Sequence, residues 1–254
     1  MSRMVVRIRA FVLIALLTGV ARPASATFSI VARDPATGEL GLAIASRVLA
    51  VRTSGSIAEA DVGVVARQAD WDTRYARRAM DLLRSGMSAP DALRTLFEER
   101  PSTTLQIAIV DAHGRVAAAT GPNALEWKGH KTGINYSVQG NVLVGPEVLD
   151  AMARAFEKTT GPLAERLFAA LRAGDAAGGD RRGRQSAHLL VVRKNGGYAA
   201  GDDRVVDVAV DDHKEPLNEL RRLLNIQHSV RQTVPPVSRT GRPGRRNDSA
   251  PGRR

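Results

Sequence analysis

The order of strand-like and helix-like segments limits the fold of this chain more than any other feature of its sequence. Alternation of apolar and polar residues and short apolar runs predict strands, and apolar residues at helical spacing predict helices. The predicted strands cover residues 27–33, 39–46, 61–68, 104–110, 115–120, 136–144, 187–192 and 204–210. The predicted helices cover residues 72–85, 88–97, 146–158, 162–173 and 216–227. Strand groups therefore alternate with helix pairs, which favours an α+β fold with two antiparallel sheets face to face and helices outside.

Residues 1–26 have the three parts of a secretory signal peptide. Arginines begin the segment, an apolar run follows from Ala10 to Val20, and Ala24 and Ala26 form a small-residue cleavage site. The apolar run is too short to span a bilayer, which takes about 20 residues. Cleavage after Ala21 is an alternative. The preferred site predicts an exported protein, periplasmic or extracellular, with no transmembrane segment in its mature chain.

Cleavage after Ala26 would make Thr27 the first residue of the mature chain. An α-amine has a pKa of about 7.7–8.0, so part of it is unprotonated near neutral pH. It can take the proton from its own residue's hydroxyl while that oxygen attacks a carbonyl carbon. Thr27 is therefore a candidate catalytic nucleophile that supplies its own base. Threonine also follows cleavage sites by chance, so the rest of the chain has to support this role.

The net charge of +11 lies mostly outside the predicted domain. Residues 1–26 carry +4 and residues 231–254 carry +6, which leaves +1 for residues 27–230. A nearly neutral domain with 4% aromatic residues gives no reason to expect nucleic-acid binding. The absence of cysteine excludes disulfides, thiol nucleophiles and cysteine metal sites. No histidine spacing suggests a metal site, so we expect no metal and no cofactor.

Four stretches of the chain carry a family resemblance: Thr27-Phe-Ser-Ile-Val-Ala-Arg-Asp34, Gly41-Leu-Ala-Ile-Ala-Ser46, Gln139-Gly-Asn141 and Gly178-Gly-Asp-Arg-Arg-Gly-Arg-Gln-Ser-Ala187. They resemble the Ntn-hydrolase-like family catalogued as domain of unknown function 1028. The resemblance runs from Thr27 to about Leu224 and implies a four-layer αββα sandwich. It also implies an amino-terminal threonine, since cytosolic members begin Met-Thr-Phe-Ser-Ile and would expose it by methionine removal. Some members add a putative peptidoglycan-binding module, which the basic tail replaces here.

Five residues are candidate partners for Thr27. Asn141 is a candidate catalytic residue that would donate a hydrogen bond to an oxyanion, or else a buried structural amide. Ser46 and Gln68 end strands at the edge where Thr27 begins one, which makes them candidate substrate-binding residues. Asp180 and Arg182 lie in a glycine-rich loop and would bind substrate charges, or else form an internal ion pair. The early strands contain no lysine, so any cationic support would come from arginine.

These observations lead to an exported hydrolase of an amide or related C–N bond. Its substrate would be a small molecule or a peptide-like compound. The sequence is compatible with a homo-oligomer. One alternative is an inactive binding or scaffold protein of the cell envelope with the same fold. Another is an envelope protein that acts through its tail, residues 231–254. That tail is rich in Pro, Gly, Ser and Arg without apolar periodicity, which predicts disorder.

Overall fold

The fold consists of two antiparallel sheets, described here from a computed structural model that covers residues 27–233. The larger sheet has the order β10 (Arg204–Val210), β9 (Ser186–Val192), β2 (Leu40–Ser46), β1 (Thr27–Arg33), β8 (Tyr136–Asn141) and β7 (Gly129–Gly133). The smaller sheet has the order β3 (Ile57–Glu59), β4 (Gly63–Gln68), β5 (Gln106–Asp111) and β6 (Val116–Thr120). The first strand, β1, is thus a central strand of the larger sheet.

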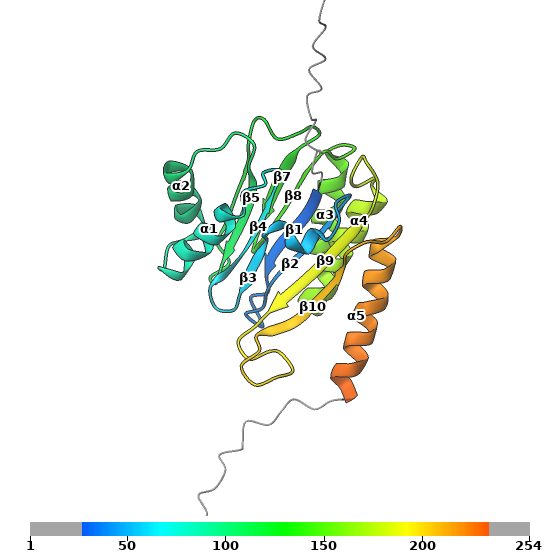
Figure 1. Cartoon of the computed structure of the whole chain (residues 1–254). Coiled ribbons are helices and arrows are strands. Elements are labelled where there is room, and N and C mark those ends of the chain that lie inside the picture. The colour runs from blue at the N-terminus through cyan, green and yellow to red at the C-terminus, as the bar shows by residue number, and fades with distance from the viewer. Residues whose placement is uncertain (1–26, 234–254) are drawn as a thin grey trace, which may run out of the picture.

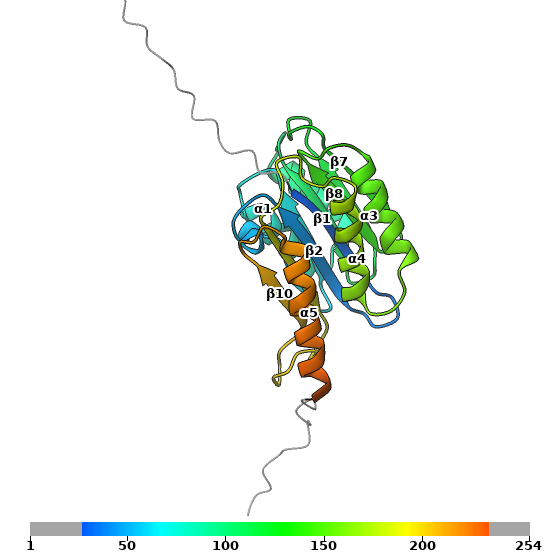
Figure 2. The ribbon, with the colours of Figure 1, turned by 90° about the vertical axis from the view of Figure 1, so that its right-hand side faces the viewer.

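Helices cover the outer face of each sheet, so the molecule has four layers (Figure 1). Helices α1 (Arg74–Arg84) and α2 (Ala89–Glu99) pack on the smaller sheet. Helices α3 (Glu147–Lys158), α4 (Leu163–Ala176) and α5 (Pro216–Thr233) cover the larger one, as Figure 2 shows from the side. The predicted α+β fold class, a four-layer αββα sandwich, is confirmed.

Strand alternation in β1 explains why its two faces serve different layers. Phe28, Ile30 and Ala32 belong to the apolar cluster under α3, α4 and α5. Val31 belongs instead to the cluster between the two sheets. Thr27 and Ser29 share the face of Val31, because side chains two residues apart lie on the same side of a strand. Thr27 therefore faces the inter-sheet layer.

Three elements differ from the sequence prediction. β7 was not predicted, because its sequence Gly-His-Lys-Thr-Gly has no apolar alternation; it is an edge strand with largely exposed side chains. β3 was not predicted either, and it is only three residues long. The last helix ends at Thr233 and not at 227, since Arg231 stacks 4.7 Å from the Tyr198 ring and donates a 3.0 Å bond to the Gly196 carbonyl.

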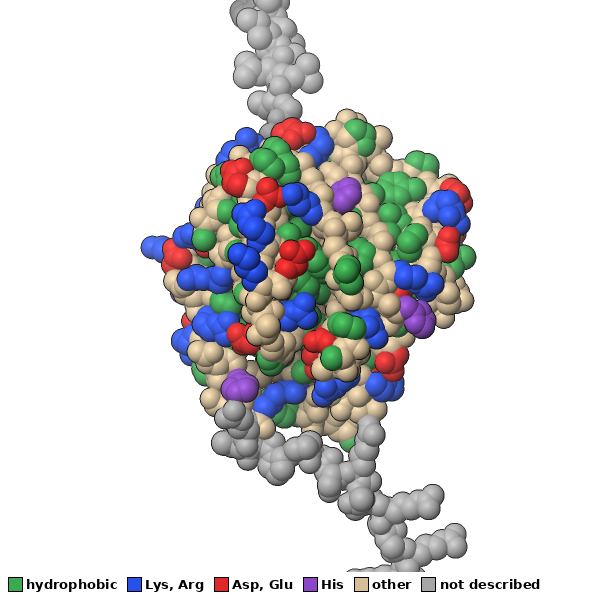
Figure 3. Space-filling view, turned by 180° about the vertical axis from the view of Figure 1, so that it is seen from behind, with side chains coloured by type: hydrophobic (Ala, Val, Ile, Leu, Met, Phe, Trp, Pro, Cys, Tyr) green, Lys and Arg blue, Asp and Glu red, His purple; other side chains and the backbone are tan. Residues whose placement is uncertain are grey.

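The predicted leader, residues 1–26, lies outside the described residues, as do residues 234–254 of the predicted tail. Residues 231–233 of that tail belong to α5 instead. Within residues 27–233, no helix is long and apolar enough to cross a membrane. Basic and acidic side chains intermingle on the face of the molecule seen in Figure 3. This distribution agrees with the small net charge of the domain.

Candidate functional site

Four polar side chains form a row across one end of the larger sheet. The register places Thr27 opposite Ser46 on one side and opposite Asn141 on the other. Ser46 in turn lies opposite Ser186. Register partners in neighbouring strands point to the same face, so all four face the inter-sheet layer. The antiparallel order of β9, β2, β1 and β8 thus brings together residues that are up to 159 positions apart.

The Thr27 hydroxyl is buried and has a defined partner. Thr27 is 2% exposed, and its Oγ1 lies 3.1 Å from Oγ of Ser46. Its carbonyl oxygen accepts a 3.1 Å hydrogen bond from Nε2 of Gln68, which ends β4 in the smaller sheet. The structure therefore brings together Thr27, Ser46 and Gln68, as the strand ends predicted.

A network of buried amides joins the two sheets beneath Thr27. Oε1 of Gln106 accepts hydrogen bonds from Nε2 of Gln68 at 2.6 Å and from Nδ2 of Asn141 at 3.1 Å. Nε2 of Gln106 donates to the Gly140 carbonyl oxygen at 2.9 Å. Oε1 of Gln68 accepts from the Ser29 hydroxyl at 2.7 Å. Because each amide is held by several partners in a low-dielectric layer, the orientation of this network is well determined.

The network fixes the orientation of the Asn141 amide. Its Nδ2 points to Gln106, whereas its Oδ1 is buried with no hydrogen-bond partner among the described residues. A buried acceptor without a partner costs about 1–3 kcal/mol. Asn141 therefore combines a structural amide contact with a free acceptor beside Thr27, where sequence reasoning expected only a donor.

A small hollow opens beside Thr27 between β4, the segment 48–54 and the start of α1. We call it the Thr27 hollow. Its volume is about 90 Å³, enough for a group of a few atoms. The lining residues used below are Thr27, Val51, Ser54, Arg67, Trp71 and Thr73. Ser186 holds one side of it, because its hydroxyl accepts a 3.1 Å bond from the Val51 N–H and donates to the Val48 carbonyl.

Arg67 places a buried guanidinium group in the wall of the Thr27 hollow. The residue is 3% exposed, and Nη2 donates to the Ser54 carbonyl oxygen. Nε and Nη1 are also buried but have no hydrogen-bond partner among residues 27–233. Burial lowers the pKa of Arg67, and the negative charges of Asp70 and Asp72 oppose that effect. An arginine nevertheless stays protonated, so the hollow contains a positive charge.

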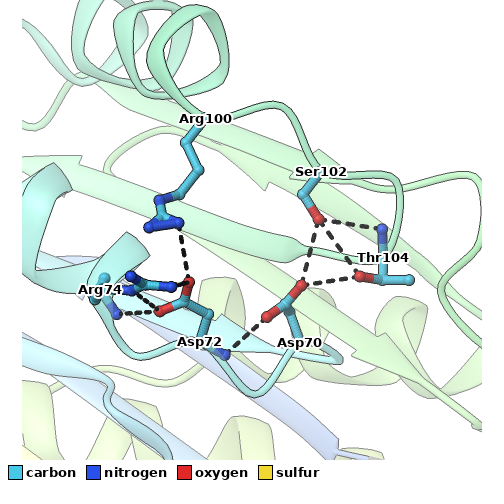
Figure 4. Close-up of polar contacts among 6 residues, drawn as sticks. All are labelled: Asp70, Asp72, Arg74, Arg100, Ser102 and Thr104. Atoms are coloured by element: carbon cyan, nitrogen blue, oxygen red, sulfur yellow. Dashed lines mark hydrogen bonds and ion pairs between the residues drawn. The ribbon is translucent and has the colours of Figure 1, made fainter.

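The acidic residues that follow Arg67 are engaged elsewhere (Figure 4). Asp72 forms an ion pair with Arg74 at 2.8 Å and accepts a 3.2 Å bond from Arg100. The hydrogen bonds from Arg74 lower the pKa of Asp72 to about 2. Asp70 accepts a 2.9 Å bond from the Thr104 hydroxyl. These contacts hold the loop between β4 and α1 in place, and neither carboxylate hydrogen-bonds the Arg67 guanidinium.

Backbone strain is concentrated around Thr27. Among the described residues, six non-glycine residues have a positive φ, and three of them flank this site. Ala50 (φ 51°) and Ala69 (φ 68°) line the Thr27 hollow, and Val142 (φ 52°) follows Asn141. Left-handed backbone is costly for alanine and more so for a β-branched valine. The surrounding contacts therefore hold this region in a conformation that its sequence does not favour locally.

Asp180 and Arg182 form an ion pair away from the Thr27 hollow. The Asp180 carboxylate accepts from Nη2 of Arg182 at 2.9 Å and from the Arg47 N–H at 2.8 Å. The loop that carries them follows α4, and Gly178 (φ 109°) and Gly179 (φ 54°) adopt the left-handed backbone that ends this helix. Asp180 and Ser46 line a second cavity, of about 420 Å³, beside Phe28. The geometry therefore matches the internal ion pair, and the carboxylate ties this loop to the end of β2.

Sequence reasoning missed Arg67 and Gln106. Gln106 begins β5, and its side chain hydrogen-bonds residues of β4, β6, β7 and β8, but a glutamine at a strand start carries no recognisable signal. Arg67 had a signal: it interrupts the apolar run Val64-Val65-Ala66 immediately before Gln68. A charged residue inside such a run lies either at an exposed sheet edge or at a buried position where it has a functional role. Its burial depends on the segment 48–54 that covers it, which the sequence pattern does not predict.

Comparison with known proteins identifies the family. A model of the family of unknown function DUF1028 matches residues 27–220. The chain belongs to this family. It is similar in structure to the DUF1028 protein SPO2555 from Silicibacter pomeroyi, with a TM-score of 0.72 and 31% identity over 80% of this chain and 86% of that one. Anbu, the ancestral beta-subunit from Yersinia bercovieri, gives a TM-score of only 0.34 at 11% identity over 83% of this chain and 99% of its own. No curated protein matches the sequence.

Proposed function

We propose that this DUF1028 protein is an exported hydrolase of an amide or related C–N bond, with the amino-terminal Thr27 as nucleophile. The observation that carries the proposal is the position of the Thr27 hydroxyl. It is buried at the start of a central strand, 3.1 Å from the Ser46 hydroxyl and at the wall of a small hollow. A leader ending at Ala26 would leave a free α-amine on this same residue.

The proposed reaction uses the α-amine as general base. The amine takes the Oγ1 proton of Thr27 while Oγ1 forms a bond to the acyl carbon. The C–N bond then breaks, and the same proton passes to the leaving nitrogen. Water, deprotonated by the α-amine, attacks the resulting ester and restores the hydroxyl. One residue thus supplies the nucleophile and the proton carrier in both half-reactions.

Neighbouring side chains have positioning roles in this proposal. Ser46 orients the Thr27 hydroxyl, and Gln68 fixes the Thr27 backbone through its carbonyl oxygen. The free Oδ1 of Asn141 would accept a hydrogen bond from the α-amine. The second hydrogen of the Asn141 amide group would donate a hydrogen bond to the oxyanion. The proposed role of Asp180 and Arg182 is to support the substrate-facing end of β2 through Arg47 and not to contact substrate.

The test uses the exported protein and a β-lactone probe, which acylates nucleophilic hydroxyl groups. Wild type and Thr27→Ser should form one adduct on the amino-terminal peptide, and Thr27→Ala should form none while melting at a similar temperature. Thr132→Ala is the matched control, because Thr132 is an exposed threonine on β7. Equal labelling of Thr27→Ala and wild type would overturn the proposal.

A further inference from the structure

The Thr27 hollow contains a positive charge that no described acidic side chain pairs with. Nε and Nη1 of Arg67 have no hydrogen-bond partner among the described residues, and the hydroxyl of Ser54 in the same hollow is likewise buried without one. Removing a charge from water costs several kcal/mol unless a counter-charge compensates for it. Both residues line the Thr27 hollow, and unsatisfied polar groups in two lining residues of one hollow indicate a site built for a ligand that the protein binds there.

The nearby acidic residues do not supply that counter-charge. Asp72 is held by Arg74 and Arg100, and Asp70 by Thr104 (Figure 4). Thr73, at the amino-terminal end of α1, lines the same hollow, and its side chain makes no capping hydrogen bond. The Asp72 carboxylate accepts a 3.0 Å hydrogen bond from the Arg74 N–H at the start of α1, so the helix terminus is already capped and the unpaired positive charge is that of Arg67. This charge favours an anionic ligand group.

The form of the hollow indicates which anion fits. A volume of about 90 Å³ admits a small planar group better than a bulky one. One cation balances one negative charge, which suits a carboxylate, whereas a phosphate monoester carries close to two. The apolar Val51 and the 57% exposed Trp71 would contact the carbon skeleton next to that group.

We infer that Arg67 binds a carboxylate of the substrate, so that the substrates are amides carrying a free carboxylate near the scissile bond. This inference rests on the proposed function of Thr27. In it, Arg67 donates from Nη1 and from the second hydrogen of Nη2, and the Ser54 hydroxyl donates to the same carboxylate. An acylated amino acid has this arrangement, with the carboxylate two bonds from the amide nitrogen. Arg67 would thereby place the amide carbonyl beside Oγ1 of Thr27.

Two β-lactone probes that differ only in a free carboxylate and its methyl ester test the inference. Wild type should label at Thr27 at least about tenfold faster with the carboxylate probe, the value expected for a hydrogen-bonded ion pair. Arg67→Met should lose this preference, so that it labels at similar rates with the two probes. Arg52→Met is the matched control. Arg52 lies on the segment 48–54, which covers Arg67, and it is an exposed arginine that pairs with Asp211. Equal rates with both probes in wild type would overturn the role of Arg67.

A binding measurement separates failure of the inference from failure of the proposed function. N-acetylglycine should raise the melting temperature of wild type, N-acetylglycinamide should not, and Arg67→Met should respond to neither. If Thr27 labels with both probes but N-acetylglycine has no effect, the carboxylate site is wrong and the nucleophile stands. If N-acetylglycine stabilises wild type alone but neither probe labels Thr27, the nucleophile is wrong and Arg67 remains a carboxylate-binding residue.

Discussion

Thr27 and Arg67 illustrate how much a single residue's role depends on its surroundings. Thr27 is one of many threonines, but its position at the start of β1 places its hydroxyl beside that of Ser46. The same position lets its carbonyl oxygen accept a hydrogen bond from Gln68. Arg67 is one of many arginines, but it is buried with two unpaired nitrogen atoms. A residue retained in a costly environment is more readily explained by ligand binding than by stability.

Arg67→Met tests this cost directly. Methionine has a similar length and removes the buried charge, so the free energy of unfolding should rise by about 1–2 kcal/mol in the absence of ligand. The melting temperature should increase by about 2–8 °C for a domain of this size. Calorimetry of both proteins measures the change. A lower melting temperature for Arg67→Met would show that Arg67 stabilises the fold. Arg52→Met is the control, which measures the effect of losing a surface charge.

At the scale of elements, the sequence predicted the strands that position Thr27. Apolar alternation predicted β1 and β2, and the turn at residues 34–38 joined them, so the meeting of Thr27 with Ser46 followed from antiparallel pairing. The pairing of Thr27 with Asn141 required the partner strand β8, whose Asn141 lies 114 positions after Thr27. β7 and the segment over Arg67 could not be predicted, because their residues show no periodicity and are held by tertiary contacts.

Asp111, at the end of β5, connects two elements and gives a pH-dependent prediction. Burial raises the pKa of this carboxyl, but hydrogen bonds from the Ala89 and His113 N–H groups and from Arg115 outweigh burial and hold the pKa below its ordinary value. A carboxyl with a depressed folded-state pKa stabilises the fold above the unfolded-state pKa of about 3.9. That contribution is lost as the pH falls through the lower folded-state pKa.

Asp111→Asn should therefore destabilise the protein by about 2 kcal/mol near neutral pH, where the charged hydrogen bonds are present. The difference from wild type should shrink below about pH 4. Urea unfolding at a series of pH values measures it. Asp61→Asn is the control, because Asp61 is exposed and asparagine tolerates its positive φ of 61°. A difference between Asp111→Asn and wild type that is constant with pH would contradict the assigned cause.

At the scale of the whole molecule, the described fold extends to the end of α5 at Thr233. The last turns of α5 belong to the fold, because Arg231 contacts Tyr198 and the Gly196 and Arg204 carbonyl oxygens. The sequence predicted the layer order from the succession of strands and helices. It did not predict this extension, because the contacts come from the β9–β10 connection and not from the helix itself.

Two truncations measure where the folded unit ends. A chain ending at residue 233 should keep the melting temperature and the Thr27 labelling of the full protein. A chain ending at residue 227 loses Arg231 and should melt several degrees lower, about 4 °C for a loss of 1–2 kcal/mol. If the first truncation abolished labelling, residues 234–254 would contribute to activity, as the tail-dependent alternative holds.

The most direct measurement is the mass of the amino-terminal peptide of the purified protein after reaction with the carboxylate β-lactone. We expect a peptide that begins at Thr27 and carries one acyl group on the threonine oxygen. A peptide that begins at another residue, or one that begins at Thr27 without the acyl group, would contradict it.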